Sequence, residues 1–143
     1  DLVRSRGLGD VYKRQAYYGA LYAIANVDGV IDSRELSLIE QIVNFHGLSA
    51  AAQSQLTSYR YQPPVLSDCL AVLAEADESL RFGLMTHLLD TSWANDELDP
   101  LEEAAIALAQ RALEIDDREM ESIKTFVQEM RTLGHQSFEQ VQL

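Results

Sequence analysis

An internal repeat constrains the fold of this chain more than any other feature of its sequence. The stretch from Ala25 to Glu35 returns in altered form 67 positions later, as the stretch from Ser92 to Glu102. The pairs aligned in this register, without a gap, are Ile31 with Leu98, Asp32 with Asp99, Glu35 with Glu102, Ile39 with Ile106, Leu48 with Ile115, Leu56 with Ile123, and Tyr59 with Phe126. A fixed offset of this kind indicates a repeated supersecondary unit, so the sequence predicts a duplicated fold.

The hydrophobic pattern is that of helices. Apolar residues recur at spacings of three and four, and the chain has 3 prolines and 7 glycines. We therefore predict an all-α domain of about seven helices. The expected ranges are 17–27, 32–46, 49–60, 66–75, 78–93, a sixth helix from 99 and a seventh over 116–133. Helices five to seven repeat helices one to three, the fourth joins the two halves, and helices one, two, five and six form an antiparallel core.

Acidic residues mark the beginnings of several of these helices. Asp32, Asp99 and Asp116 each stand at an N-cap position, and a glutamate follows three residues later in each case, which is the spacing of a capping box. Gly134 is expected to end the seventh helix, because glycine readily adopts the left-handed conformation of a helix stop. Residues 135–143 are then expected to form a polar tail.

The first fifteen residues differ in character from the rest. Residues 5–15 match the translation of a transposon adapter used in sequencing libraries, and such segments are set aside in fold reasoning. We therefore expect residues 1–15 to be a non-native leader, disordered or irregular, followed by a helical domain over residues 16–134. Four basic and two acidic residues lie in the leader, so 7 basic and 21 acidic side chains remain, a formal charge of −14 against −12 for the whole chain.

This acidity limits the classes of partner. A strongly negative surface repels phosphate backbones, which argues against a nucleic-acid partner and favours cations or a protein partner with a basic surface. The single cysteine, Cys69, excludes an internal disulfide and fits a reducing, cytoplasmic setting. No apolar run within the chain is long enough for a membrane span. An anchor upstream would place the domain at the inner face of a membrane.

The two repeated turns carry the candidate functional residues. The candidate ligands are Asp28, Asp32 and Glu35 in the first turn, and Asp99 and Glu102 in the second, with Asn95 and Asp96 as further candidates. Oxygen ligands gathered between two helices suit a hard divalent cation, Ca²⁺ or Mg²⁺ rather than Zn²⁺.

Two interpretations of these turns stay open. Helix capping explains Asp32, Asp99 and the glutamates without any ligand. Capping does not explain the acids that precede the caps, Asp28, Asp96 and Glu97, which together need solvent or a counter-ion such as a bound cation. An EF-hand is excluded, because counting from Asp28 puts Ser33 where glycine is required and Ile39 where the last ligand is required.

The first turn also carries a family resemblance. The pattern Ala25-x-x-Asp28-Gly29-x-Ile31-Asp32-x-x-Glu35, followed by an amphipathic helix and Gly47-Leu48-Ser49, resembles the TerB family of tellurite-resistance proteins. The same domain occurs near the N-terminus of membrane-anchored DnaJ-like co-chaperones. The resemblance extends over nearly all of residues 16–133. The chain departs from the family pattern at Asn95-Asp96, where Asp-Gly is expected, and it contains no J-domain His-Pro-Asp.

The resemblance implies a non-enzymatic, all-helical module linked to tellurite and other stress resistance. It implies acidic positions at Asp28, Asp32, Glu35, Asp99 and Glu102, with metal binding suggested for the turns. It also implies membrane-associated assemblies, so a protein-interaction adaptor with purely structural turns is the alternative function. The residues themselves show no nucleophile and base set that would predict an enzyme. Three histidines, His46, His87 and His135, have no ligand-like spacing.

Overall fold

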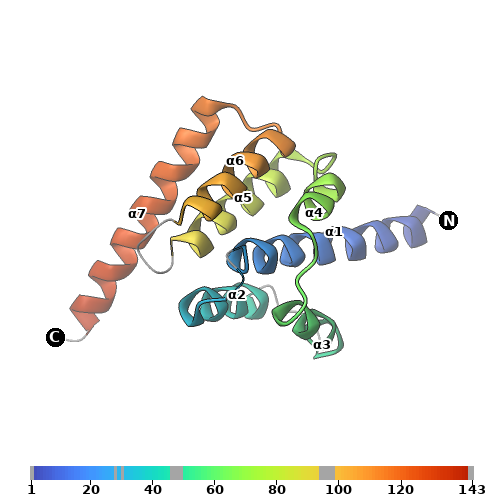
Figure 1. The fold of residues 1–143 in the computed structure, drawn as a ribbon, viewed down its shortest axis with the longest axis horizontal. Helices are drawn as coiled ribbons and strands as arrows, with labels where there is room; N and C mark the ends of the chain where they lie inside the picture. Colours follow the sequence, from blue (N-terminus) through green and yellow to red (C-terminus); the bar gives the residue numbers. More distant parts are fainter. Residues whose placement is uncertain (1, 28, 30, 46–49, 94–98, 142–143) are drawn as a thin grey trace.

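The computed structural model describes residues 2–27, 29, 31–45, 50–93 and 99–141, and within these ranges the chain is helical with no strand. The helices in chain order are α1 (Leu2–Ala25), α2 (Ser33–Phe45), α3 (Ala50–Thr57), the short 3₁₀ helix η1 (Ser58–Arg60), α4 (Leu66–Leu73), α5 (Glu78–Ser92), α6 (Pro100–Ala112) and α7 (Asp117–Val141) (Figure 1). The all-α prediction is confirmed.

Two expected boundaries are wrong. Helix α1 begins at Leu2, so residues 2–15 are helical and not irregular. Helix α7 passes through Gly134 and continues to Val141, so residues 135–141 belong to a helix and not to a separate tail. Glycine in a helix interior costs only about 1 kcal/mol relative to alanine. A glycine without a following proline therefore weakens a helix without ending it.

Helix α4 is part of the core and not merely a connector. Helix α1 packs most extensively against α4, and then against α5 and α2. Glycine at position 19 allows the close approach, because a Cβ atom there would lie 2.8 Å from Pro64 Cγ and 3.0 Å from Cys69 Sγ. The expected core of helices one, two, five and six is therefore corrected: α1 and α5 form its centre, and α4 packs on α1 beside them.

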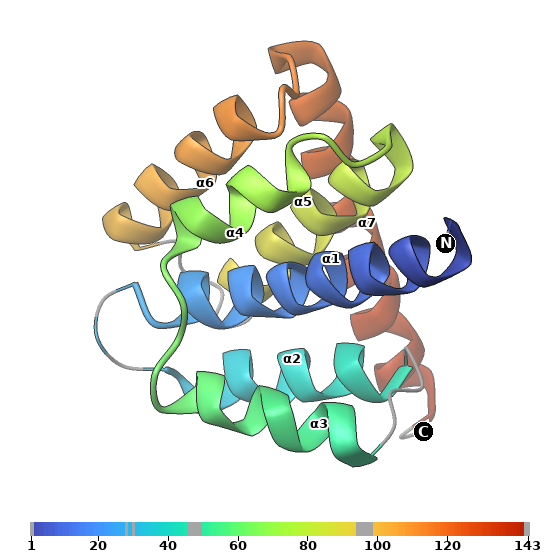
Figure 2. The same cartoon turned by 90° about the vertical axis from the view of Figure 1, so that its right-hand side faces the viewer.

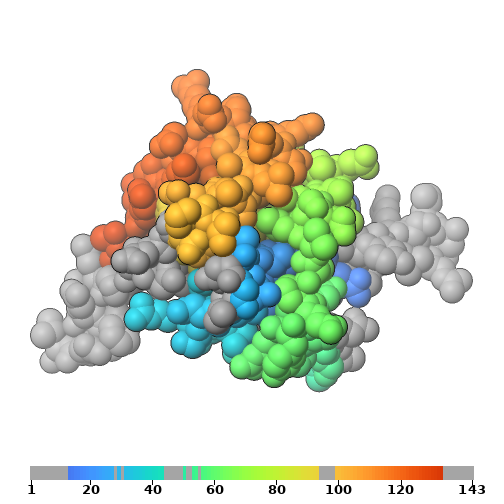
Figure 3. All heavy atoms as spheres, in the orientation of Figure 1, coloured from blue at the N-terminus to red at the C-terminus, as the bar shows by residue number. Residues whose placement is uncertain are grey.

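The ends of α1 and α5 and the beginnings of α2 and α6 lie on one side of the molecule. In Figure 2, α1 and α5 both run from right to left, and α2 and α6 both begin at the left. Helices α1 and α6 are in contact, and in Figure 3 the end of α1 (light blue) lies directly below the beginning of α6 (gold). The end of α1 and the beginning of α6 therefore lie on the same side of the molecule.

Most of the expected core positions are buried. Leu21 and Leu88, which correspond in the repeat, are both fully buried, and Ile39 and Ile106 are buried at the equivalent positions of α2 and α6. Further buried side chains are Ile42, Val43, Leu56, Leu70, Leu73, Ala109, Ile115 and Met120. Leu108, on α6, is 40% exposed. The apolar stripe of α6 runs through Ala105 and Ala109 instead.

Arg81, near the beginning of α5, binds backbone groups that follow the ends of α4 and α6. Its Nε donates to the backbone oxygen of Ala76, after α4 (3.0 Å), and its Nη1 donates to that of Leu113, after α6 (2.6 Å). Carbonyl groups at a helix C-terminus lack intrahelical partners, and a guanidinium is well suited to satisfy them. The chain then turns into α7 through Glu114, whose φ is 56°. This is the left-handed conformation that more often falls to glycine.

Candidate functional site

The α1–α2 connection begins with a short hydrogen-bonded turn. After α1 the Asn26 backbone N–H donates to Tyr22 O (3.1 Å), and the Gly29 N–H donates to Asn26 O (2.9 Å). Glycine 29 has a φ of +93°, a conformation that side chains with a Cβ rarely adopt. A left-handed glycine therefore follows the end of α1. The chain then enters α2 at Asp32, whose Oδ1 accepts a hydrogen bond from the Arg34 N–H (2.8 Å).

The α5–α6 connection enters α6 in the same way. Asp99 stands at the N-cap, and its Oδ1 accepts a hydrogen bond from the Leu101 N–H (2.7 Å). Pro100 occupies the first helical position, where its missing N–H has no cost. The predicted N-cap roles of Asp32 and Asp99 are therefore confirmed, and both carboxylates remain partly open to solvent.

The two N3 glutamates are buried, which the capping interpretation did not anticipate. Glu35 is 3% exposed and Glu102 is 4% exposed, and the Oε2 atom of each has almost no surface in contact with solvent. Both side chains have interaction partners within the chain. Each lies four residues before a buried isoleucine, Ile39 or Ile106, so each continues the core-facing stripe of its helix.

The beginning of α7 shows what the same spacing does in an exposed setting. There Glu119 Oε1 accepts a hydrogen bond from the Asp116 N–H (3.0 Å), and Asp116 Oδ1 accepts one from the Glu119 N–H (2.7 Å). This is a complete capping box, as predicted. Its aspartate is exposed and its glutamate is only half-buried. The burial of Glu35 and Glu102 is therefore not a consequence of capping itself.

The described part of the chain does not by itself complete a metal site. Within it, no group of three or more His, Cys, Asp or Glu side chains is arranged to hold a metal ion. Asp32 and Glu35 share the first turn of α2, and Asp99 and Glu102 share that of α6. The remaining candidates, Asp28, Asn95 and Asp96, lie outside the described residues. The donors that are described are hard oxygens, and they fit Ca²⁺ or Mg²⁺ chemistry better than that of Zn²⁺.

A long-range contact that the sequence does not indicate holds the end of α5. Arg131, on α7, donates through Nη1 to Asp90 Oδ1 (3.0 Å) and through Nη2 to Trp93 O (2.6 Å). Trp93 is the residue that follows α5 and begins the second connection. Nothing local in the sequence marks this contact, because it joins residues 41 and 38 positions apart.

The remaining candidate groups have structural settings. Cys69 is buried, and this burial, together with the neighbouring Asp68 carboxylate, raises the pKa of its thiol to about 11. A thiol of this kind is a weak nucleophile at neutral pH. His87 forms a hydrogen bond through Nδ1 with the hydroxyl of Tyr17, and burial raises the pKa of that phenol. The side chains of His46 and His135 lie outside the described residues.

Tyrosine side chains along α1 belong to the core. Tyr17, Tyr18 and Tyr22 are each at most 6% exposed. The Tyr17 and Tyr18 rings meet edge to face with their centroids 5.7 Å apart, which is a favourable geometry for aromatic pairs. This aromatic stripe is therefore part of the packing in the structure and is not an open groove.

Comparison with protein-family models, curated proteins and solved structures yields no match to this chain. Over the described residues, none of the helices combines the length and the apolar character that crossing a membrane requires.

Proposed function

We propose that this chain is a non-enzymatic, cytoplasmic binding module of the TerB type, which binds a divalent cation at its acidic interhelical connections. The observation that carries the proposal is the burial of Glu35 and Glu102 at the same position of two helices. A buried carboxylate is costly unless positive charge or hydrogen bonds compensate it. Partners within the chain and the positive end of the helix dipole compensate part of this cost, and a cation beside the connection would compensate more of it.

Two further features support an equivalent role for the two connections. Asp32 and Asp99 both cap through the second amide of the helix, with distances of 2.8 and 2.7 Å. The helices that follow both carry a buried isoleucine one turn after the glutamate. We infer that the two units derive from the duplication that the 67-residue offset indicates. The first connection is the stronger candidate for the cation, because it keeps the Asp-Gly that the second lacks.

Thermal unfolding with and without metal tests this proposal. Millimolar Ca²⁺ or Mg²⁺ is expected to raise the melting temperature of the EDTA-treated protein, because a ligand that binds the folded state stabilises it. The double variant Asp28→Ala with Asp99→Ala is expected to lose this shift. The double variant Asp77→Ala with Asp116→Ala removes two acids from helix N-caps elsewhere and is expected to keep it. An unchanged melting curve in metal would overturn the cation role.

A protein-interaction adaptor is the second candidate, and a surface feature of α7 favours it. Phe126, Met130 and Leu133 are each more than half exposed, and their spacing places them along one side of the helix. Together with the net charge of −12, this favours a partner that combines a basic surface with an apolar contact. Such a complex should weaken at high salt. It should also weaken in Met130→Glu while remaining intact in Asp28→Ala with Asp99→Ala, which separates this function from cation binding.

A further inference from the structure

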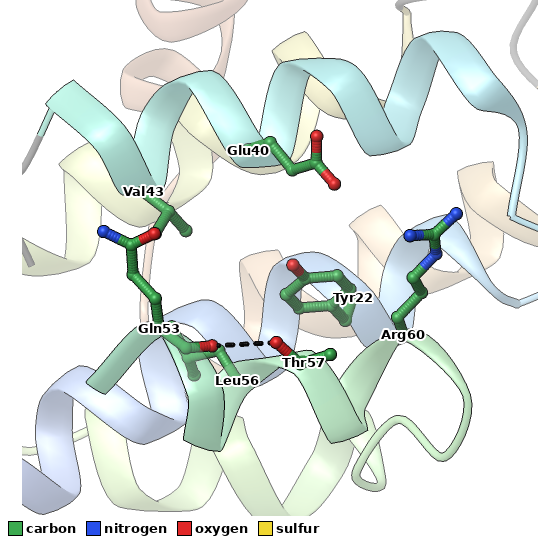
Figure 4. Close-up of a pocket in the computed structure, with 7 residues that line it drawn as sticks. All are labelled: Tyr22, Glu40, Val43, Gln53, Leu56, Thr57 and Arg60. Atoms are coloured by element: carbon green, nitrogen blue, oxygen red, sulfur yellow. Dashed lines mark hydrogen bonds between the residues drawn. The ribbon is translucent and has the colours of Figure 1, made fainter. Parts of the chain in front are cut away.

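A polar pocket lies between α1, α2, α3 and η1. Its volume is about 270 Å³, and Figure 4 shows the side chains around it. The lining residues are Tyr22, Glu40, Val43, Gln53, Leu56, Thr57 and Arg60. None of them belongs to the acidic connections. Sites for drug-sized ligands span roughly 300–1,000 Å³, so this pocket fits a molecule at the small end of that range.

Opposite charges face the pocket from different helices. Glu40 extends into it from α2, and Arg60 extends into it from η1 (Figure 4). The ion pairs between described residues join Lys124 with Glu121 and Arg131 with Asp90, so Glu40 and Arg60 do not form one with each other. Both residues are exposed, and their charged groups face a shared space (Figure 4).

The Tyr22 ring borders the same space, with Glu40 on one side of it and Arg60 on another (Figure 4). Burial raises its pKa, and the Glu40 carboxylate raises it further, while the Arg60 guanidinium lowers it. Both charges therefore act on the same point of the pocket. The Arg60 guanidinium also lies over the Tyr61 ring, 5.7 Å from its centroid, a cation–π contact that restricts where the guanidinium can move.

One wall of the pocket is apolar. Val43 and Leu56 are 6% and 5% exposed. The Tyr22 ring is held edge to face against Tyr59, with the centroids 6.3 Å apart. The Thr57 hydroxyl donates to the backbone oxygen of Gln53 (3.1 Å) within α3, which is the dashed line in Figure 4. A ligand here would therefore meet one anion, one cation and an aliphatic surface together.

We propose that this pocket binds a small zwitterion of the free α-amino-acid type. Its ammonium group faces Glu40, its carboxylate faces Arg60, and an aliphatic side chain lies against Val43 and Leu56. Charge-assisted hydrogen bonds of this kind are about twice as strong as neutral ones, and arginine is the side chain best suited to a carboxylate. The proposal does not depend on cation binding at the connections.

A matched set of three small molecules tests the proposal on the unmodified chain. L-leucine carries both charges, 4-methylpentanoate lacks the ammonium, and 3-methylbutylamine lacks the carboxylate. Isothermal titration calorimetry or amide chemical-shift titration is expected to show binding of L-leucine with a dissociation constant of about 0.1–1 mM, as suits a ligand of so few atoms. Each analogue is expected to bind about tenfold more weakly, because one charged contact is lost.

Two variants assign the charges to their partners. In Glu40→Gln, L-leucine and 4-methylpentanoate should bind about equally, because the ammonium no longer has its partner. In Arg60→Gln, L-leucine and 3-methylbutylamine should bind about equally for the corresponding reason. Glu103→Gln and Arg118→Gln, which change exposed side chains of α6 and α7, should keep the preference for L-leucine.

Several results would overturn the proposal. It is wrong if L-leucine produces no change at millimolar concentration, or if the unmodified chain binds either analogue as tightly as L-leucine. The second result would indicate a simple anion or cation site. Because these comparisons use the unmodified chain, the proposal stays testable even if a variant fails to fold.

Discussion

The two helices that follow the acidic connections, α2 and α6, begin alike. The two helices that precede them, α1 and α5, end differently. At the α1–α2 connection a left-handed glycine, Gly29, lies between Ala25 and Asp32, and nearby backbone groups provide its hydrogen bonds. At the α5–α6 connection the end of α5 is held by Arg131 from α7. The end of α1 is thus held by backbone groups close to it in the chain, and the end of α5 is held by a helix that follows much later. Two helix ends that precede similar acidic sequences can therefore be held in different ways.

Removing a buried glutamate should have the largest effect. Glu35→Ala and Glu102→Ala are each expected to reduce the free energy of unfolding by about 3 kcal/mol, because they leave buried polar partners unsatisfied and remove packed atoms. Glu119→Ala, in the exposed capping box of α7, should cost about 1 kcal/mol. Urea unfolding of the three variants measures the difference. Equal losses in all three would show that burial adds nothing to capping.

Breaking the Arg131 contact should have the next largest effect on the free energy of unfolding. It removes an interaction at the end of α5 and none at the end of α1. Arg131→Met keeps the aliphatic stem and removes the bonds to Asp90 and Trp93, so we expect a loss of about 2 kcal/mol. Arg118→Met, an exposed position on the same helix, should change stability by less than about 0.5 kcal/mol. If the two variants unfold at the same urea concentration, the end of α5 does not need Arg131.

The corresponding weak point of the first connection is Gly29. Gly29→Ala is expected to cost about 1–2 kcal/mol, because L residues are strained at this φ, although a Cβ would have no neighbour within 4 Å. The matched control is Gly83→Ala in the interior of α5, where a Cβ would lie 3.7 Å from the Tyr17 hydroxyl, an ordinary contact distance. That variant should be stabilised by up to about 1 kcal/mol. Melting temperatures that shift in the same direction would contradict this assignment.

The smallest effect tests what the connections have in common. Asp32→Ala and Asp99→Ala each remove one N-cap, so each should cost about 1 kcal/mol. The two losses should agree within about 0.5 kcal/mol, because both aspartates accept one hydrogen bond of nearly equal length. Chemical denaturation in EDTA isolates this effect from any metal. A clearly larger loss at one position would mean that its aspartate has a role beyond capping.

Local patterns predicted the helices well and their packing less well. The N-caps at Asp32, Asp99 and Asp116 were predictable because capping depends on residues three or four positions apart. The extension of α7 beyond Gly134 was not, since a glycine permits a helix stop without requiring one. The packing of α4 on α1 depends on the absence of a side chain at Gly19. No periodicity of α4 itself reveals that.

For the candidate site, too, local features were predictable and contacts between helices were not. The spacing identified Asp32, Glu35, Asp99 and Glu102, and it placed them at helix beginnings. The burial of the two glutamates could in principle have been predicted from the sequence, because each lies one turn before an isoleucine of the core stripe. Two other contacts could not have been predicted from the sequence, since both arise from the approach of separate helices. They are the hydrogen bond of Arg131 to Trp93 and the placement of Glu40 opposite Arg60.

The attachment of α7 has a consequence for how the molecule opens. Helix α7 packs chiefly against α5, whereas α1 packs against α4, α5 and α2. Local opening is easiest where an element has few packed neighbours, so the amides of α7 should exchange with deuterium sooner than those of α1. Each such opening would also release the Trp93 carbonyl. The end of α5 would thus be released together with α7, on a timescale that the end of α1 does not share.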